Sequence, residues 1–300
     1  MPFLKRIFFF SLVNIAMVLT ISLVLSLFNV RPYLHAYGLD YSSLAVFCLV
    51  WGMGGAFFSL ALSRVIAKWT MGVQIIDPNS SGEYGELART VHRLAKAARL
   101  PAMPEVGVYE SGEINAFATG PTKARSLVAV SSGLLRNMRP NEIEGVLAHE
   151  ISHVANGDMV TMTLIQGVVN AFVMFLARIA AFAVSQAMAS RNDRDSGRGS
   201  PMVYYMITML FELVFGLIGA IIVASFSRWR EFRADRGGAT LAGRESMQAA
   251  LRRLLANQEA YDHSASPAVA ALKINGRRGG LMALFATHPP LEARIERLSR

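Results

Sequence analysis

Two long apolar stretches without a charged residue constrain this chain more than any other feature. They run from Ile7 to Phe28 and from Leu44 to Leu62. Each has about the 20 residues that a helix needs to cross the core of a bilayer. Hydrophobic residues make up 53% of the 300-residue chain, which is more than an ordinary soluble domain carries. The sequence therefore predicts a membrane protein. The first apolar run outlasts the h-region of a signal peptide and lacks a small-x-small cleavage site, which favours a retained anchor.

Two further apolar stretches contain one charge each. The stretch from Met159 to Ala189 contains Arg178, and the stretch from Met202 to Phe226 contains Glu212. Both are long enough to cross a bilayer, and a re-entrant hairpin is the alternative. Because charges inside a membrane usually pair or line a cavity, we expect Arg178 and Glu212 to form an ion pair. Charges that face water along a substrate path are the rival interpretation.

The basic residues that flank the apolar stretches predict the orientation. The formal net charge is +9, and no basic patch is interleaved with aromatic residues, so we expect no nucleic-acid partner. Basic residues at the span ends favour cytoplasmic termini: Lys5, Arg6, Arg64, Lys68, Arg228, Arg230, Arg233 and Arg236. Three arginines in the loop between the third and fourth stretches oppose this orientation: Arg191, Arg194 and Arg198. The lone Cys48 excludes an internal disulfide and a cysteine-cluster metal site.

The polar parts of the chain predict one catalytic domain that is discontinuous in sequence. We expect an N-terminal pair of spans at 1–66, a first half of the domain at 67–158, a second pair of spans at 159–226 and a second half at 227–300. The fold class is thus a mixed α/β, multi-pass membrane protein with four transmembrane helices and a cytoplasmic domain.

Periodicity and turn residues predict the elements of the two polar halves. Helices are expected at Glu83–Leu100, from Pro140 onward and around Met247–Leu255, and strands at Glu105–Tyr109, Asn115–Ala118 and Ser126–Val130. Asn141 and Glu144 have the spacing of a capping box for the helix that begins near Pro140. The glycine-rich segment Asp262–Gly280 is expected to be a loop.

A pentad on the helix after Pro140 predicts a metal site. His149 and His153 are four residues apart, so both imidazoles lie on one face of the helix and can bind one Zn²⁺ ion. Glu150 lies beside them, where its carboxylate can take a proton from water that the ion activates. This is the chemistry of peptide-bond hydrolysis.

A hydrolytic zinc ion needs a third protein ligand and one open position. Glu231 is the best candidate, because Glu231 and Asp235 share a helix face directly after the fourth apolar stretch. Asp235 can then accept a hydrogen bond from a ligand histidine. A solvated ion-pair face with the neighbouring arginines is the alternative. Because His153 and Glu231 lie close to the ends of apolar stretches, we expect the site at the cytoplasmic membrane surface.

Four motifs together resemble the HtpX family of bacterial membrane zinc metalloproteases, which are related to the CAAX prenyl endoproteases. They are His149-Glu150-x-x-His153, the pentad Glu231–Asp235, Asn115-Ala116-Phe117-Ala118 and Thr287-His288-Pro289-Pro290. The resemblance covers nearly the whole chain. It implies a zincin-like domain with one zinc ion per chain, and Glu231 as the third ligand. It also implies that the strand with Asn115, Ala116 and Phe117 binds substrate backbone, and that His288 and Arg294 help to hold the substrate carbonyl.

The residues predict a zinc-dependent endopeptidase built into a membrane, and the resemblance implies that it cleaves misfolded or damaged membrane proteins in the bacterial inner membrane. Strand addition recognises a peptide backbone with little sequence preference, which suits a protease of broad specificity. His288 has an alternative role as a residue that stiffens the turn before Pro289. The rival functions are a catalytically silent membrane scaffold with a structural metal and a dedicated protease for prenylated peptides. Expected partners are these substrates and the lipid bilayer, and a homo-oligomer is compatible with the sequence.

Overall fold

The computed structural model describes residues 34–35, 38–192, 201–264 and 281–300. The first predicted span, Ile7–Phe28, lies outside these residues, and so does most of the predicted loop Asp262–Gly280. Two compact units divide the chain. We call Leu60–Thr161 with Ala224–Arg300 the mixed unit, and the described residues of Phe3–Ser59 with Met162–Val223 the helical unit.

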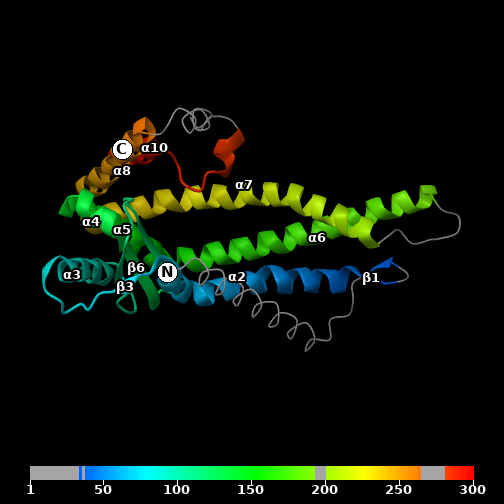
Figure 1. Cartoon of the computed structure of the whole chain (residues 1–300), viewed down its shortest axis with the longest axis horizontal. Coiled ribbons are helices and arrows are strands. Elements are labelled where there is room, and N and C mark those ends of the chain that lie inside the picture. The colour runs from blue at the N-terminus through cyan, green and yellow to red at the C-terminus, as the bar shows by residue number, and fades with distance from the viewer. Residues whose placement is uncertain (1–33, 36–37, 193–200, 265–280) are drawn as a thin grey trace. The chain divides into compact units, whose positions relative to one another are not determined.

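The elements follow one another along the chain as labelled in Figure 1. The strands are β1 (Leu34–His35), β2 (Gly38–Leu39), β3 (Gln74–Ile75), β4 (Glu105–Tyr109), β5 (Ala116–Thr122) and β6 (Arg125–Ser131). The helices are α2 (Tyr41–Met71), α3 (Gly82–Ala97), α4 (Ser132–Asn137), α5 (Pro140–Asn156), α6 (Asp158–Asn192), α7 (Pro201–Ala242), α8 (Arg244–Ser264) and α10 (Leu291–Ser299), with the 3-10 helix η1 at Leu281–Phe285.

Three described helices are long and apolar enough to cross a membrane: α2, the Asp158–Met188 part of α6, and α7. They contain the second, third and fourth predicted spans. Both α6 and α7 are unbroken helices, and α7 continues past the predicted end of the fourth span at Phe226 to Ala242. The pentad Glu231–Asp235 therefore lies on the same helix as that span.

Small residues bring helices together in the helical unit. A Cβ atom added to Gly52 of α2 would lie 2.6 Å from the backbone nitrogen of Ala171 of α6. Only a glycine permits such close packing, as is common between membrane helices. The predicted ion pair is confirmed: Arg178 Nη1 lies 2.6 Å from Glu212 Oε1, and the Arg178 guanidinium lies 5.5 Å from the centroid of the Phe47 ring.

The mixed unit is built on a four-stranded sheet with the order β3-β4-β6-β5. Strands β4 and β6 are parallel, and β3 and β5 are antiparallel to their neighbours. The four residues Leu127–Val130 of the inner strand β6 are fully buried, as their unbroken apolar run predicts. Strand β5 is at the end of the order and, in the described part of the chain, pairs with β6 alone. One of its edges thus has no partner strand.

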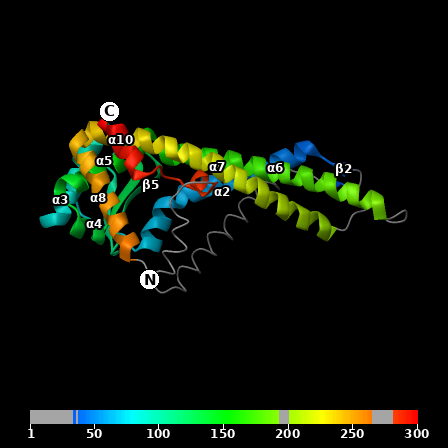
Figure 2. The same ribbon diagram turned by 90° about the horizontal axis from the view of Figure 1, so that it is seen from above.

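Helix α5 is the centre of the mixed unit. It contacts β5 and β6 as well as α3 and α8 (Figure 1), and Leu147 and Ile151 bury fully in the core that these elements share. Helix α10 in turn packs against α8 (Figure 2), where Leu298 joins a small apolar cluster with Met247. These contacts place residues from both halves of the sequence around one helix.

The start of α5 corrects one prediction. Its N-cap is Arg139, and Pro140 is the first helical residue, a position that suits proline because no backbone N–H is needed there. Glu142 accepts a hydrogen bond from the Arg139 backbone N–H at 2.8 Å. The prediction that Asn141 and Glu144 form the capping box is therefore wrong. Glu144 instead accepts a hydrogen bond from Arg93 at 2.7 Å.

Candidate active site

Three predicted ligands converge in the mixed unit. His149 and His153 come from α5 and Glu231 from α7, and all three are buried. The two Nε2 atoms are 3.1 Å apart, His149 Nε2 lies 3.5 Å from Glu231 Oε2, and His153 Nε2 lies 3.3 Å from Glu231 Oε1. Tetrahedral Zn²⁺ with bond lengths of about 2.0–2.1 Å requires ligand atoms about 3.3 Å apart. The spacing of the three donors fits such an ion.

The hydrogen bonds around the histidines also favour a cation between the three donors. The Nδ1 atom of His149 lies 3.0 Å from Asp235 Oδ1, and that of His153 lies 2.6 Å from Asp158 Oδ2. When each Nδ1–H donates to its carboxylate, both Nε2 lone pairs point toward Glu231. Among the described residues, the two Glu231 carboxylate oxygens are buried without a well-formed hydrogen bond. Three facing acceptors need a positive charge between them.

The pKa of His153 reflects the same preference for positive charge. Burial lowers this pKa, but hydrogen bonds to Asp158 and Glu231 raise it by more, so that it reaches about 9. For His149 the balance has the same direction: burial lowers the pKa, and Asp235 and Glu231 raise it by more. Both histidines therefore lie in surroundings that stabilise a cation.

Asp158 is a residue of the site that the sequence analysis missed. Helix α5 ends at Asn156, and its C-cap Gly157 has a left-handed backbone with φ of 71°, which turns the chain so that Asp158 lies beside His153. Asp158 is 1% exposed and also pairs with Arg233 of α7. A signal exists in the sequence: an acidic residue follows a helix-ending glycine at the very start of an apolar stretch, where a carboxylate is costly unless it has partners.

Arg294 lies in the site, but mainly as the partner of Asp235. Its Nε and Nη2 donate to the two Asp235 oxygens at 2.8 and 2.6 Å, and its Nη1 lies 3.6 Å from Glu231 Oε2. Burial lowers the pKa of Arg294, but the hydrogen bonds and charge of Asp235 raise it by more. Most of the Arg294 N–H donors are therefore engaged within the protein. Fewer of them are left for the predicted contact with the substrate carbonyl.

His288 contacts Glu231, the third predicted ligand, from the side that is open to solvent. Its side chain is 58% exposed, and its Nδ1 lies 2.9 Å from Glu231 Oε2. Arg228 of α7 donates to the backbone carbonyls of Leu284 and Ala286 at 2.9 and 2.7 Å, which fixes the segment that leads to His288. This anchoring role of Arg228 was not predicted, because span-flanking arginines were interpreted only as orientation signals.

A cavity of about 160 Å³ joins these residues to the edge strand. Its lining includes His149, Glu150, Glu231, His288 and Arg294 together with Asn115, Ala116 and an apolar wall from α8. Phe117 is not among the lining residues, and its ring instead contacts Tyr109, with centroids 5.7 Å apart. The structure thus brings together nine of the ten residues predicted for the site, all except Phe117. They line the cavity or contact the residues that line it: His149, Glu150, His153, Glu231, Asp235, His288, Arg294, Asn115 and Ala116.

Three other histidines, His35, His92 and His263, belong to elements that do not carry the three proposed ligands. His92 Nε2 lies 3.1 Å from the carbonyl oxygen of Pro104, which gives this partly buried ring a structural partner. His35 belongs to β1 and His263 to the last turn of α8. Among the described residues, the group of possible ligands that lie within reach of one ion is His149, His153 and Glu231.

Comparison with known proteins identifies the family. Residues 81–300 match the model of peptidase family M48. The chain is 50% identical over 300 residues to the protease HtpX homolog of Methylacidiphilum infernorum, covering 99% of this chain and 98% of that protein. It is 49% identical over 302 residues to the protease HtpX homolog of Bacillus subtilis, covering 98% of each chain.

A solved structure shares the fold. The crystal structure of S. mikatae Ste24p aligns with a TM-score of 0.63 at 17% sequence identity. The alignment covers 98% of this chain, which spans 64% of the length of that protein. The family match and the HtpX relatives do not favour a silent scaffold or a dedicated protease for prenylated peptides. The chain belongs to peptidase family M48, as a bacterial membrane-bound metalloprotease of the HtpX group.

Proposed function

We propose that one Zn²⁺ ion per chain is held by His149, His153 and Glu231 and that the site hydrolyses peptide bonds. The observation that carries the proposal is the spacing of the three buried donors, 3.1 to 3.5 Å, which suits one tetrahedral ion. Two imidazoles and one carboxylate are the ligands of a hydrolytic zinc ion and leave its fourth position open. When bound, the ion supplies a Lewis acid that polarises the peptide carbonyl and makes water acidic near neutral pH.

Glu150 is proposed as the general base. It follows His149 on α5, is partly exposed and lines the cavity beside the ligands. In this position its carboxylate takes a proton from the attacking water and then delivers it to the nitrogen of the leaving amine. Asp158 and Asp235 hold the Nδ1 protons of the two histidines, which keeps both Nε2 lone pairs directed at the ion.

The open edge of β5 is proposed to bind the substrate backbone. Asn115 exchanges hydrogen bonds with Ser131, since its carbonyl accepts from the Ser131 backbone N–H at 2.9 Å and its own N–H donates to Ser131 Oγ at 3.1 Å. In an antiparallel pair, every second residue of a strand directs its backbone N–H and C=O groups at the neighbouring strand. Because Asn115 directs its groups at β6, the N–H and C=O groups of Ala116 and Ala118 face away from β6. An extended peptide that adds there would lie along the cavity that contains Glu150. Phe117 supports the strand through its contact with Tyr109.

His288 and Arg294 are proposed to have different roles near the substrate oxygen. His288 is exposed and lines the cavity, so its ring can donate to the oxygen that becomes negative as water attacks. Arg294 acts chiefly as a positioning residue, because it holds Asp235, which in turn holds His149. Nε and Nη2 of Arg294 are engaged by Asp235, so Nη1 is the nitrogen that can still donate a hydrogen bond to the substrate carbonyl.

The proposed cellular role is the cleavage of misfolded or damaged proteins in the bacterial inner membrane. Recognition through backbone hydrogen bonds tolerates many sequences, as such a role requires. We propose four spans, with the segments 67–158 and 227–300 forming the catalytic domain on the cytoplasmic side together with both termini. The basic residues after the second and fourth apolar stretches support this orientation.

The proposed function is tested by removing and restoring the metal. The full chain in detergent is treated with a chelator, and casein cleavage is measured before treatment, after it and after addition of one equivalent of Zn²⁺. We expect activity to vanish and to return with zinc. The Glu231→Gln variant should bind less than one zinc per chain and remain inactive after the addition. Casein cleavage that persists in chelated protein without zinc would rule the proposal out.

A further inference from the structure

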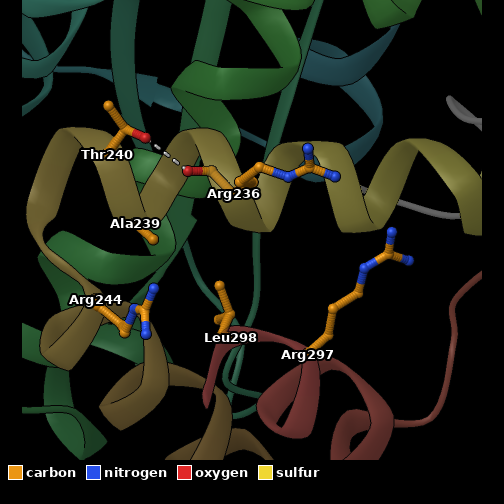
Figure 3. A pocket seen from close by; sticks show the side chains of 6 residues that line it. All are labelled: Arg236, Ala239, Thr240, Arg244, Arg297 and Leu298. Atoms are coloured by element: carbon orange, nitrogen blue, oxygen red, sulfur yellow. Dashed lines mark hydrogen bonds between the residues drawn. The ribbon is translucent and has the colours of Figure 1, made fainter. Parts of the chain in front are cut away.

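Three arginines of the mixed unit line a second hollow, of about 410 Å³, that has no part in the site described above. Arg236 comes from α7, Arg244 from the first turn of α8 and Arg297 from α10 (Figure 3). Gly243, with φ of 88°, makes the turn between α7 and α8 and so brings Arg244 to this place. Three helices therefore contribute one positive charge each, and Arg297 comes from a segment more than 50 residues after the other two.

The three guanidinium groups lack acidic partners in the described part of the chain. All three residues are exposed, and among the described residues no carboxylate lies within 4.0 Å of their nitrogens. Two of the three acidic residues next to them in sequence are engaged elsewhere, since Asp235 pairs with Arg294 and Glu296 pairs with Arg300 at 2.6 Å. The third, Glu245, follows Arg244 directly and, in the described part of the chain, forms no ion pair with any of the three arginines. Figure 3 shows the guanidinium groups of Arg236 and Arg297 on one side of the hollow and that of Arg244 on the other, so the three side chains frame the hollow with positive charge.

The walls of the hollow are fixed by packing. Its floor contains Ala239 and Leu298, and Leu298 packs in the apolar cluster that joins α10 to α8. The guanidinium of Arg297 lies 4.5 Å from the centroid of the Phe232 ring, a cation–π contact that orients its planar group. An oriented guanidinium loses little freedom when it binds phosphate through two parallel hydrogen bonds.

We propose that this hollow binds a phosphate group, and that Arg236, Arg244 and Arg297 are its ligands. Inorganic phosphate and the head group of an anionic phospholipid share this chemistry, and the apolar floor also accommodates the glycerol carbons of a lipid. A bound phosphate would link α7, α8 and α10 at the positions next to Asp235 and one turn from Arg294. The anion would bind whether or not the metal site hydrolyses peptides.

The test uses the full chain in a neutral detergent and buffers without phosphate. Native mass spectrometry measures binding of phosphatidylglycerol and, as the zwitterionic control, phosphatidylcholine of the same chain length. In parallel, the melting temperature is followed as sodium phosphate is added, against sodium chloride at equal ionic strength. We expect one tightly bound phosphatidylglycerol if the source is lipid, or a saturable rise of the melting temperature with phosphate if the source is the free anion.

Single variants assign the binding to the hollow. Arg236→Gln, Arg244→Gln and Arg297→Gln should each weaken binding about fivefold. Arg297→Lys should weaken it less than Arg297→Gln. The matched control is Arg252→Gln, which removes an exposed arginine of α8 that does not line the hollow and should leave the affinity unchanged. The proposal is overturned if neither probe binds, or if Arg252→Gln weakens binding as much as the three variants do.

Discussion

Asp158 Oδ2 lies 2.6 Å from His153 Nδ1, although Asp158 is the first residue of a helix whose apolar part is long enough to cross a membrane. The Asp235 carboxylate has the equivalent relation to His149, at 3.0 Å. Each of the two histidines proposed as ligands thus has its own carboxylate, one from before and one from after the apolar stretches of α6 and α7. Such partners fix the tautomer of the ring and make the opposite nitrogen a better ligand.

Replacing Asp158 by Asn should weaken zinc binding about 10- to 100-fold. An amide can still fill the space, but it no longer neutralises Arg233 or holds the His153 proton as strongly. Zinc affinity is measured by competition with a chromogenic chelator, and activity at saturating zinc should recover in large part. Asp77→Asn, at an exposed turn of the mixed unit, is the control. Equal zinc affinity in wild type and Asp158→Asn would refute the role of Asp158.

Replacing Arg294 by Lys should lower kcat and zinc affinity about tenfold each while KM stays unchanged. A lysine cannot form the two parallel hydrogen bonds that Arg294 makes with Asp235. Steady-state kinetics with a peptide substrate separate the two constants. A rise in KM with unaltered zinc affinity would show instead that Arg294 acts mainly on the substrate.

Replacing Ala118 by Pro should lower kcat/KM about fivefold, the effect of about one lost hydrogen bond. The Ala118 N–H faces the open edge of β5, where proline is tolerated in a strand. Ala118→Ser retains the N–H and is the control. Peptide cleavage is measured for both variants together with their melting temperatures. Identical kcat/KM values in two equally stable variants would argue against substrate binding at this edge.

Replacing Glu212 by Gln should lower the melting temperature of the detergent-purified protein and leave its zinc content unchanged. The change removes the charge that Arg178 contacts at 2.6 Å and leaves the Arg178 cation without its carboxylate. Thermal unfolding and metal analysis of the same preparations give the two readouts. An unchanged melting temperature would count against a stabilising role of the pair.

Much of the fold follows from local patterns in the sequence. The strand Glu105–Tyr109 has the predicted bounds, and β6 extends the predicted Ser126–Val130 by one residue at each end. Apolar runs with at most one charge gave the positions of α2, α6 and α7. The start of α5 at Pro140 was predicted, but its capping box was assigned to the wrong residues. Asn141 and Glu144 have the spacing of such a box, whereas Pro140 already occupies the first helical position and Arg139 is the N-cap.

The proposed ligands His149 and His153 could be placed together from the sequence, because helix periodicity alone puts both on one face. The partners of those ligands depend on tertiary contacts, which periodicity does not contain. Asp158 reaches His153 through a turn at Gly157, and Arg294 meets Asp235 from a helix 59 residues later in sequence. The pair of Arg178 and Glu212 could be predicted from the sequence, because both charges lie inside apolar stretches, where few other partners exist.

The central claim is that Glu150 activates water at a zinc site, and its most direct test compares wild type with Glu150→Gln. Both proteins are purified as full chains in detergent, brought to one zinc per chain, and assayed for casein cleavage. Equal zinc content shows that the ligands are intact, so any difference lies in proton transfer. We predict that Glu150→Gln is about 10²- to 10⁴-fold slower. Equal rates of casein cleavage would contradict the account.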